Sequence, residues 1–564
     1  MKKHILSATV FLALASAAYA IPFDNTAVGG VVKVGPAVIP ADGYTSLSAA
    51  ATAYSALVGG INANWTVEIQ GDLAETSNSY YGNATNGFTL TFKPAAATNP
   101  VVTFTGTSGT TSGSFVMGIN VSTAVAAGNT FATVNGYVID GSNTVAGTTR
   151  DMTFQSNPTV GTNTNMVRIV GDTDGVVIKN MNLIGKRTGA VTENLIGFAG
   201  GVLVTSLLPD NEVVRNCNLD VSAAGNTAAT SGIVTNSSVS AIGTAVPAGT
   251  NMTGHLYENN VVVARHRGFA PLYIRNWTVR NNTITITNPN SSATSTAIGD
   301  LLANGGTGGT LTITGNKIIG LATTNKTGVG ATFVGSIAGI TVGAGGGTNY
   351  VINNNTISGF AYGGTAVQDS IFRGIYASSG GDNYAIEHNS INLAAQAVVS
   401  APTGATAGNI AGIFVPAMTT GVLSIKNNII LNAAVGTIVN GVYISGATGF
   451  AATDISGNDI FTSAGNIGTV VGGAGSPYAT FAAWQTAGYD SAGSGGQSVD
   501  PTTTTPPWDS TLHFALRPIV GLGNVGGGST TLTDVDGDTR RVINSPPGAD
   551  FPVVGTAVRD WVAY

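Results

Sequence analysis

The stretch Val279-Arg280-Asn281-Asn282-Thr283-Ile284 contains a pattern that recurs along the chain. An apolar residue is followed by any residue, then by Asn, Gly or His, then by asparagine, any residue and an apolar residue. Segments 352–357, 425–430 and 455–460 keep this pattern closely. Looser copies place the following residues at the asparagine position: Met181, Cys217, Asn260, Asn316 and Asn389. Successive copies lie 22 to 43 residues apart, so the motif is constant while its spacing varies.

A column of glycines accompanies the motif at a nearly constant offset. Seven copies have a glycine 14 to 17 residues upstream, namely Gly201, Gly268, Gly299, Gly339, Gly374, Gly412 and Gly441. Most of these glycines open short strands rich in Val, Ile and Thr, a composition typical of β-structure. Two columns at a fixed offset, with variable loops between them, predict a β-solenoid. We expect Gly87 to Thr469 to form one continuous stack of parallel strands.

The asparagine column predicts a sharp corner in every coil. Asparagine is the non-glycine residue that best tolerates the left-handed backbone of a tight turn. Stacked asparagine side chains also exchange amide hydrogen bonds between neighbouring chains. We therefore expect a structural ladder made of seven residues: Asn260, Asn282, Asn316, Asn355, Asn389, Asn428 and Asn458.

These two columns resemble the repeats of right-handed parallel β-helices in pectate-lyase-like secreted proteins, many of them bacterial surface proteins. The resemblance covers Trp65 to Thr469. It implies an all-β, right-handed parallel β-helix solenoid with an N-terminal helical cap and an irregular C-terminal tail. Lyases, hydrolases, phage tailspikes and adhesins share this fold, so the resemblance does not by itself assign a function.

Four segments are expected along the chain. Residues 1–20 are typical of a signal peptide, with Lys2 and Lys3, an apolar run and the cleavage site Ala18-Tyr19-Ala20, and they predict a secreted or cell-surface protein. Residues 21–64 form a strand and helix cap, with a helix over 46–58 that places Leu47, Ala50, Ala51, Tyr54, Leu57 and Val58 on one face. Residues 65–470 form the β-helix. Residues 471–564 form a C-terminal capping segment and tail, with a short helix over 480–485.

Composition excludes several classes of protein. The 564 residues include only 22 Lys and Arg against 28 Asp and Glu, too few basic groups for a nucleic-acid binder. The single cysteine, Cys217, excludes a disulfide scaffold, and we expect it to be buried. After the signal peptide, no apolar run is long enough to predict a membrane span.

We expect no catalytic residues, no metal and no cofactor. The pairs Asp172 with Asp174 and Asp210 with Glu212 are interpreted as turn residues in single loops. Asp534, Asp536 and Asp538 are spaced like the start of a calcium loop. A tight turn salt-bridged to Arg540 or Arg541 is the competing interpretation, because the glycine is one position early and no bidentate glutamate follows.

One basic cluster stands out from the low background of charge: Arg265, His266, Arg267 and Arg275. It has two interpretations, an anion-binding site for uronate or sulfate groups or a solvated corner. Arg280 lies nearby, but it belongs to the position two residues before the motif asparagine. Residues at that position become neighbours on adjacent coils. We therefore expect an outer ion ladder of Arg215, Glu258 and Arg280, and a second pair of Glu387 with Lys426.

Two functions remain open at this stage. The first is an exported, non-catalytic β-helix: an adhesin, a glycan-binding protein or a self-assembling matrix protein. The second is a polysaccharide lyase or glycoside hydrolase that acts on an acidic glycan, with the segment from Arg265 to Arg280 in its cleft. The low charge and the missing carboxylate cluster favour the first.

Overall fold

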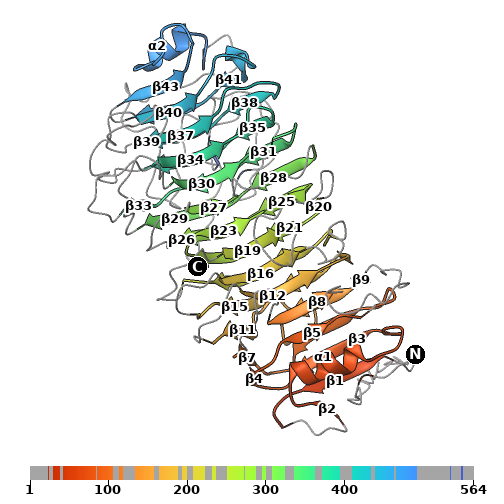
Figure 1. Cartoon of the computed structure of the whole chain (residues 1–564). Helices are drawn as coiled ribbons and strands as arrows, with labels where there is room; N and C mark the ends of the chain where they lie inside the picture. Colours follow the sequence, from red (N-terminus) through yellow and green to blue (C-terminus); the bar gives the residue numbers. More distant parts are fainter. Residues whose placement is uncertain are drawn as a thin grey trace, which may run out of the picture.

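The computed structural model of the chain is a long solenoid of stacked strands. Helix α1 (Leu47–Ser55) lies near one end and helix α2 (Phe481–Thr486) at the other (Figure 1). Among the described residues, no helix is long and apolar enough to span a membrane. The structure describes residues 23, 29–37, 42–83, 85–105, 114–118, 134–157, 164–187, 193–199, 208–222, 231–236, 251–271, 274–287, 295–299, 308–323, 336–343, 345–362, 371–393, 410–432, 439–462, 465–491, 534 and 548–549.

Three long parallel sheets, here called A, B and C, contain most of the described strands. Sheet A consists of β1 (Gly30–Val34), β2 (Gly43–Tyr44), β3 (Trp65–Ile69), β6 (Leu90–Pro94), β10 (Tyr137–Asp140), β14 (Val177–Lys179), β17 (Val213–Arg215), β21 (Leu256–Glu258), β25 (Trp277–Arg280), β28 (Thr310–Thr314), β31 (Asn349–Asn353), β35 (Asn383–Glu387), β38 (Leu423–Lys426) and β41 (Ile455–Ser456). Sheet B consists of β4 (Leu73–Glu75), β7 (Val101–Phe104), β11 (Met152–Ser156), β15 (Met181–Ile184), β18 (Asn218–Asp220), β22 (Val261–Ala264), β26 (Thr283–Ile286), β29 (Lys317–Thr323), β32 (Thr356–Ile357), β33 (Phe360–Tyr362), β36 (Ser390–Leu393), β39 (Ile429–Asn432) and β42 (Asp459–Thr462).

Sheet C completes each coil. Its strands are β5 (Ser79–Tyr81), β8 (Phe115–Gly118), β12 (Thr164–Val170), β16 (Glu193–Ala199), β19 (Ser231–Asn236), β23 (Arg267–Ala270), β27 (Ser295–Ile298), β30 (Ser336–Val342), β34 (Ile371–Ala377), β37 (Ile410–Val415), β40 (Val439–Ile444) and β43 (Asn466–Val470). Two small parallel pairs, β9 (Val134–Asn135) with β13 (Thr173–Asp174) and β20 (Met252–Thr253) with β24 (Ile274–Arg275), lie between sheets C and A. A 3-10 turn, η1, covers Ala452–Asp454.

The chain passes through sheets A, B and C in turn in every coil. Strands β25, β26 and β27 form one coil, and each pairs in parallel with the equivalent strand of the next coil, β28, β29 and β30. All described pairs between named strands are parallel, so the predicted all-β parallel β-helix is confirmed. We call the A-to-B, B-to-C and C-to-A connections the first, second and third corners.

Alternating side chains fill the core, and glycines let two sheets approach. In β25, Trp277 and Val279 are buried while Arg280 is exposed. Five glycines of the predicted column lie in sheet C, where an added Cβ would overlap an isoleucine Cγ2 of sheet B: Gly268 with Ile284, Gly339 with Ile357, Gly374 with Ile391, Gly412 with Ile430 and Gly441 with Ile460. Gly201 lies outside the described residues. The glycine column therefore marks where sheets B and C pack closely.

At the first corner, the left-handed backbone and the ladder hydrogen bond belong to two consecutive residues. The left-handed backbone occurs one residue before the motif asparagine, as at Asn281 (φ 56°) and Asn354 (φ 54°). His388 and Gly457 fill the same position in other coils. The expectation that the motif asparagine itself adopts this conformation is wrong. The residue that follows the left-handed position carries the continuous ladder, while left-handed residues bond to one another between some coils, as Asn216 Nδ2 does to Oδ1 of Asn180 at 2.6 Å.

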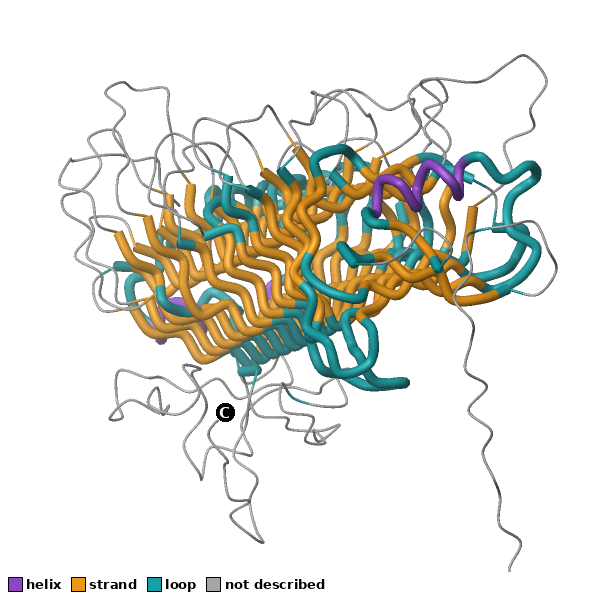
Figure 2. Tube along the Cα trace, turned by 90° about the horizontal axis from the view of Figure 1, so that it is seen from below, coloured by secondary structure: helices purple, strands orange, loops and turns teal. Residues whose placement is uncertain are grey.

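The seven motif asparagines stack into a hydrogen-bonded ladder with a single direction. Asn282 donates from its backbone N and its Nδ2 to Oδ1 of Asn316, at 3.1 and 2.9 Å. Asn316 donates in the same way to Asn355, at 3.1 and 3.0 Å. Nδ2 of Asn316 also donates to the carbonyl of Val279 at 3.0 Å. The same bonds recur at every rung from Asn260 to Asn458, and Figure 2 shows short turns stacked in a regular row beside the strands.

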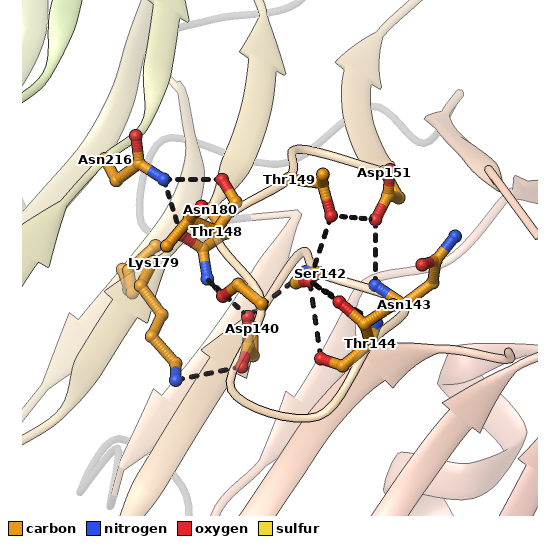
Figure 3. A network of polar contacts seen from close by, with 12 residues as sticks. Asp140, Ser142, Asn143, Thr144, Thr148, Thr149, Asp151, Lys179, Asn180 and Asn216 are labelled. Carbon is orange, nitrogen blue, oxygen red and sulfur yellow. Dashed lines mark hydrogen bonds and ion pairs between the residues drawn. The ribbon is translucent and has the colours of Figure 1, made fainter. Parts of the chain in front are cut away.

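Two coils before the ladder lack the asparagine. Cys217 stands at the ladder position, where its Sγ donates to the Ile178 carbonyl at 3.7 Å. Burial raises the pKa of this thiol to about 12, so it stays protonated. A loop over 141–151 clamps the outside of the same corner (Figure 3). Asn180 Nδ2 donates to the Gly147 carbonyl at 3.1 Å, and Asn216 Nδ2 donates to the Thr148 carbonyl at 2.8 Å. The clamp therefore supplies bonds where the ladder has none.

The C-terminal cap imitates one further coil. Asp490 is fully buried and takes the place of the next asparagine, since its Oδ1 accepts from the backbone N and Nδ2 of Asn458 at 2.9 and 3.1 Å. Its Oδ2 accepts from Nε1 of Trp484 at 2.8 Å. The indole of Trp484 packs against Gly468 in the last strand of sheet C. A carboxylate only accepts hydrogen bonds, so the ladder ends there.

The N-terminal cap is a short helix over the first coil. Helix α1 is capped by the Ser46 side chain, and the Glu75 carboxylate accepts from the backbone N of Leu47 at 2.6 Å. Leu47, Ala50, Ala51 and Tyr54 are buried, as expected, and Leu57 is half-buried. Val58 is 86% exposed, so its predicted place on the packed face is wrong. The helix ends at Ser55, three residues before Val58.

The outer ion ladder tests the coil register. Arg215 lies in strand register with Glu258, and Glu258 lies in strand register with Arg280, on adjacent strands of sheet A. Oε2 of Glu258 lies 2.8 Å from Nε and 2.6 Å from Nη2 of Arg280. The predicted register is therefore confirmed, and the 43-residue interval before Asn260 hides no additional coil. Glu387 and Lys426 are also in register.

Replacing Asn316 by alanine should destabilise the protein strongly. The change leaves the Nδ2 and backbone N of Asn282 without their shared acceptor inside the core, at a cost of about 3 kcal/mol or more. The matched control is Asn281→Gly, in the exposed left-handed turn of the same corner, which should change stability by less than about 1 kcal/mol. Unfolding in guanidinium chloride, followed by circular dichroism, measures both. Equal losses for the two variants would contradict the role of the ladder.

Candidate functional site

The predicted basic cluster does not form one site. Arg265 and His266 lie at the second corner and are almost fully buried, at 3% and 1% exposed, so the interpretation of a solvated corner is wrong for both. Arg267 begins β23 and is half-buried. Arg275 belongs to β24, at the third corner, on the other side of sheet C. The structure therefore separates Arg275 from the other three residues.

Arg267 belongs to a column of sheet C that continues to the far end of the solenoid. Strand register places the following residues one above another on successive coils: Ser231, Arg267, Thr296, Ala338, Arg373, Ala411, Asn440 and Asn466. Arg267 and Arg373 are three coils apart, or about 14 Å at the usual strand spacing. One face of the solenoid therefore carries both guanidinium groups.

Three aromatic residues stack beside this column on the last coils of sheet C. Tyr376, Phe414 and Tyr443 are in register on β34, β37 and β40. Their ring centroids are 5.2 Å apart for Tyr376 and Phe414 and 5.3 Å apart for Phe414 and Tyr443, the second pair nearly parallel at 12°. We call these three residues the aromatic stack. Tyr376 and Phe414 are half-buried, and Tyr443 is buried.

Arg373 completes this arrangement. Its guanidinium carbon lies 4.0 Å from the ring centroid of Tyr376 and 3.8 Å from that of Phe414. Gly374 and Ile375, the two residues between Arg373 and Tyr376, pack toward the core, so Arg373 and Tyr376 face outward. Burial lowers the pKa of Arg373, while its bond and charge interaction with Tyr376 oppose that shift.

The aromatic stack carries a signal in the sequence that the motif analysis did not use. Each ring lies two residues after a glycine of the second column: Gly374-Ile375-Tyr376, Gly412-Ile413-Phe414 and Gly441-Val442-Tyr443. We interpreted these triplets as strand openings only. Because Ile375, Ile413 and Val442 are buried in the core, strand alternation places the ring that follows each of them on the outer face. An aromatic residue at that position is therefore an outward ring.

The carboxylates near the third corner are not confined to single loops. Asp174 and Asp210 form a bridge between adjacent coils, and Nδ2 of Asn211 donates to Oδ1 of Asp174 at 2.8 Å. Asp174 and Asp210, which we interpreted as residues of single loops, are therefore stacked on each other across two coils. Within the described ranges, no group of three or more His, Cys, Asp or Glu side chains is arranged to hold a metal ion. Of the three candidate calcium ligands, Asp534 is buried, and Asp536 and Asp538 lie outside the described residues.

Two ionisable residues are buried next to this corner. Glu212 is fully buried; its Oε1 accepts from Oγ1 of Thr173 at 2.8 Å, and Oε2 has no hydrogen-bond partner. His255 is in contact with the carbonyl of Pro209 at 3.0 Å and the hydroxyl of Tyr257 at 2.9 Å. Burial raises the pKa of Glu212 well above its usual value, and burial lowers the pKa of His255 to about 4. Both side chains are therefore most stable in their neutral forms.

No protein-family model matches the chain, and no curated protein matches it significantly.

Glu212→Gln should raise the melting temperature at alkaline pH. The raised pKa of Glu212 means that its contribution to stability is complete below pH 4.5 and is lost as the pH rises through the folded-state value. The lowered pKa of His255 acts in the opposite direction, because its contribution is complete above pH 6.5 and is lost toward pH 4. Melting curves between pH 4 and pH 9 should therefore show the Glu212→Gln benefit only on the alkaline side. A pH-independent loss of stability would contradict the buried, neutral state of Glu212.

Proposed function

We propose that the protein is an exported, non-catalytic β-helix that binds a glycan on the outer face of sheet C. The aromatic stack is the observation that carries this proposal. Aromatic rings present broad apolar faces and contribute large contact areas at little entropic cost. Phe414 and Tyr443 pack face to face and the Arg373 guanidinium covers Phe414, so the half-buried edges of Tyr376 and Phe414 are the ring surfaces that a sugar unit would contact. The adjacent guanidinium of Arg373 adds polar recognition.

Export rests on the sequence of residues 1–20. An adhesin on a cell surface and a soluble glycan-binding protein would use the same face. Self-assembly through the ends has less support, because α1 covers the first coil and Asp490 and Trp484 close the last described coil. The lyase or hydrolase alternative predicts product formation, which the experiment below measures directly.

Phe414→Ala should weaken glycan binding by at least about tenfold, a loss of about 1.4 kcal/mol. A glycan array identifies the ligand, and isothermal titration calorimetry then compares the variants. Phe461→Ala is the matched control, because Phe461 is also half-buried but faces outward from sheet B. It should bind as the wild type does.

Each glycan that binds is also assayed for new reducing ends and unsaturated products. Binding without turnover supports the proposal. Turnover would replace it with the lyase or hydrolase alternative. If no glycan binds, or if Phe461→Ala weakens binding as much as Phe414→Ala, the outer face of sheet C is not the glycan site.

A further inference from the structure

The outer face of sheet B changes character toward the C-terminal end of the solenoid. Strand register aligns one column of outward positions along this face. Near the middle of the chain, Val261 is 37% exposed, and Thr283 and Lys317 are half-buried. The column is covered on its last four strands, where its residues are all buried: Thr356, Ser390, Ile429 and Asp459.

Ile429 is an apolar residue of this column that lies outside the main core. Ile430, its neighbour in β39, belongs to the core, so strand alternation turns Ile429 outward. The side chain of Ile429 is nevertheless fully buried, and it packs with the half-buried Leu431 and Phe461. An outward isoleucine that is fully buried requires a segment that covers it.

Gly548 and Ala549 lie on this surface. The backbone N of Gly548 donates to the carbonyl of Asn427 at 2.7 Å. The backbone N of Ala549 donates to Oγ of Ser390 at 2.9 Å, and Ala549 is fully buried. Ser390 and Ile429 are in register on adjacent coils, so the contact spans two coils. We call Gly548–Ala549 the strap, and the surface formed by Ser390, Asn427 and Ile429 the dock.

The dock selects glycine at the first strap position. Gly548 has a φ of 92°, a backbone conformation that residues with a side chain rarely adopt. A Cβ on this residue would lie 2.6 Å from Cδ1 of Ile429 and 3.0 Å from Oγ of Ser390. The backbone conformation and the available space therefore both require glycine, and the contact is specific for the sequence of the strap.

The chain between the C-terminal cap and the strap is much longer than one molecule requires. Asn427 precedes the ladder residue Asn428, and only two rungs separate Asn428 from Asp490 in the cap. Two rungs correspond to about 10 Å along the solenoid. Gly548 follows Asp490 by 58 residues, and an extended chain of that length can span about 190 Å. The strap of one molecule can therefore reach the dock of another.

We propose that the strap exchanges between molecules, so that the dock of one copy binds Gly548–Ala549 of a second copy. Recognition uses two backbone N–H groups, a glycine and one small side chain, and these are identical in either copy. Exchange of an identical element is a low-cost route to a dimer. Within one molecule the strap has the higher effective concentration, so a rising protein concentration favours exchange. The dock lies on sheet B, apart from the proposed glycan site on sheet C.

Two variants of the full chain separate the strap from the dock. Gly548→Val inactivates the strap and leaves the dock, whereas Ile429→Asp inactivates the dock and leaves the strap. Each variant alone should be a monomer, and an equimolar mixture should form a one-to-one heterodimer in sedimentation velocity experiments. The matched control is Val261→Asp, which introduces the same charge on an exposed position of the same column. Mixed with Gly548→Val, it should form at least tenfold less heterodimer, because its strap occupies its own dock.

A heterodimer that appears only in the mixture of strap and dock variants supports the inference. A monomeric mixture would overturn it. Dimers of Gly548→Val alone would also overturn it, because they would show association through an uncovered dock without a strap. Glycan binding enters none of these measurements, so their failure leaves the proposed function in place.

A second measurement uses the wild-type chain if either variant fails to fold, as judged by circular dichroism. A synthetic peptide with the sequence of residues 544–551 is added in excess, and hydrogen–deuterium exchange is followed by mass spectrometry. The peptide should displace the strap and raise the exchange rate of the Ala549 amide in the chain at least tenfold. An unchanged exchange rate would show that the dock does not accept the strap from another molecule and would overturn the inference.

Discussion

The amide hydrogen bond between successive motif asparagines constrains the whole solenoid. Each side chain donates in the same direction along the stack and accepts with its single oxygen from the coil before it. Such a chain of bonds tolerates neither a slipped register nor a missing coil, because every donor needs the next oxygen at hydrogen-bond distance. Two successive motif asparagines therefore form the same hydrogen bond whether 22 or 39 residues separate them. The lengths of the second and third corners can vary without disturbing the first.

The polarity of the ladder explains the residues at its two ends. A further asparagine at the last rung would present new donors with no coil to receive them. Asp490 accepts from Asn458 and Trp484 and donates nothing from its carboxylate. At the other end, the backbone N of Cys217 donates to Oδ1 of Asn260 at 2.9 Å, but its side chain has only a weak thiol donor, and the loop over 141–151 supplies additional bonds from outside (Figure 3). Stability is thus concentrated at the first corner.

The features of this protein that follow directly from the sequence repeat could be predicted from the sequence. The parallel stack, the register of Glu258 with Arg280 and the packed face of α1 depend on local, periodic patterns, and all were predicted. Which of two adjacent turn residues takes the left-handed conformation depends on where the next coil lies, and that assignment was wrong. The burial of Arg265 and Glu212 depends on neighbouring coils in the same way. The aromatic stack was missed because its neighbouring rings lie 29 to 38 residues apart in sequence, at a position that the asparagine motif does not include.

The asparagine corner holds the solenoid together, and the proposed glycan site lies on the outer face of sheet C. Hydrogen–deuterium exchange with and without the bound glycan tests both halves in one measurement. In the free protein, the amides of the ladder rungs from Asn260 to Asn458 should exchange slowly and together, as one cooperative unit. Added glycan should then increase protection in β34, β37 and β40 and leave the first corner unchanged. Fast exchange at the rungs, or new protection at the first corner in place of sheet C, would contradict the account.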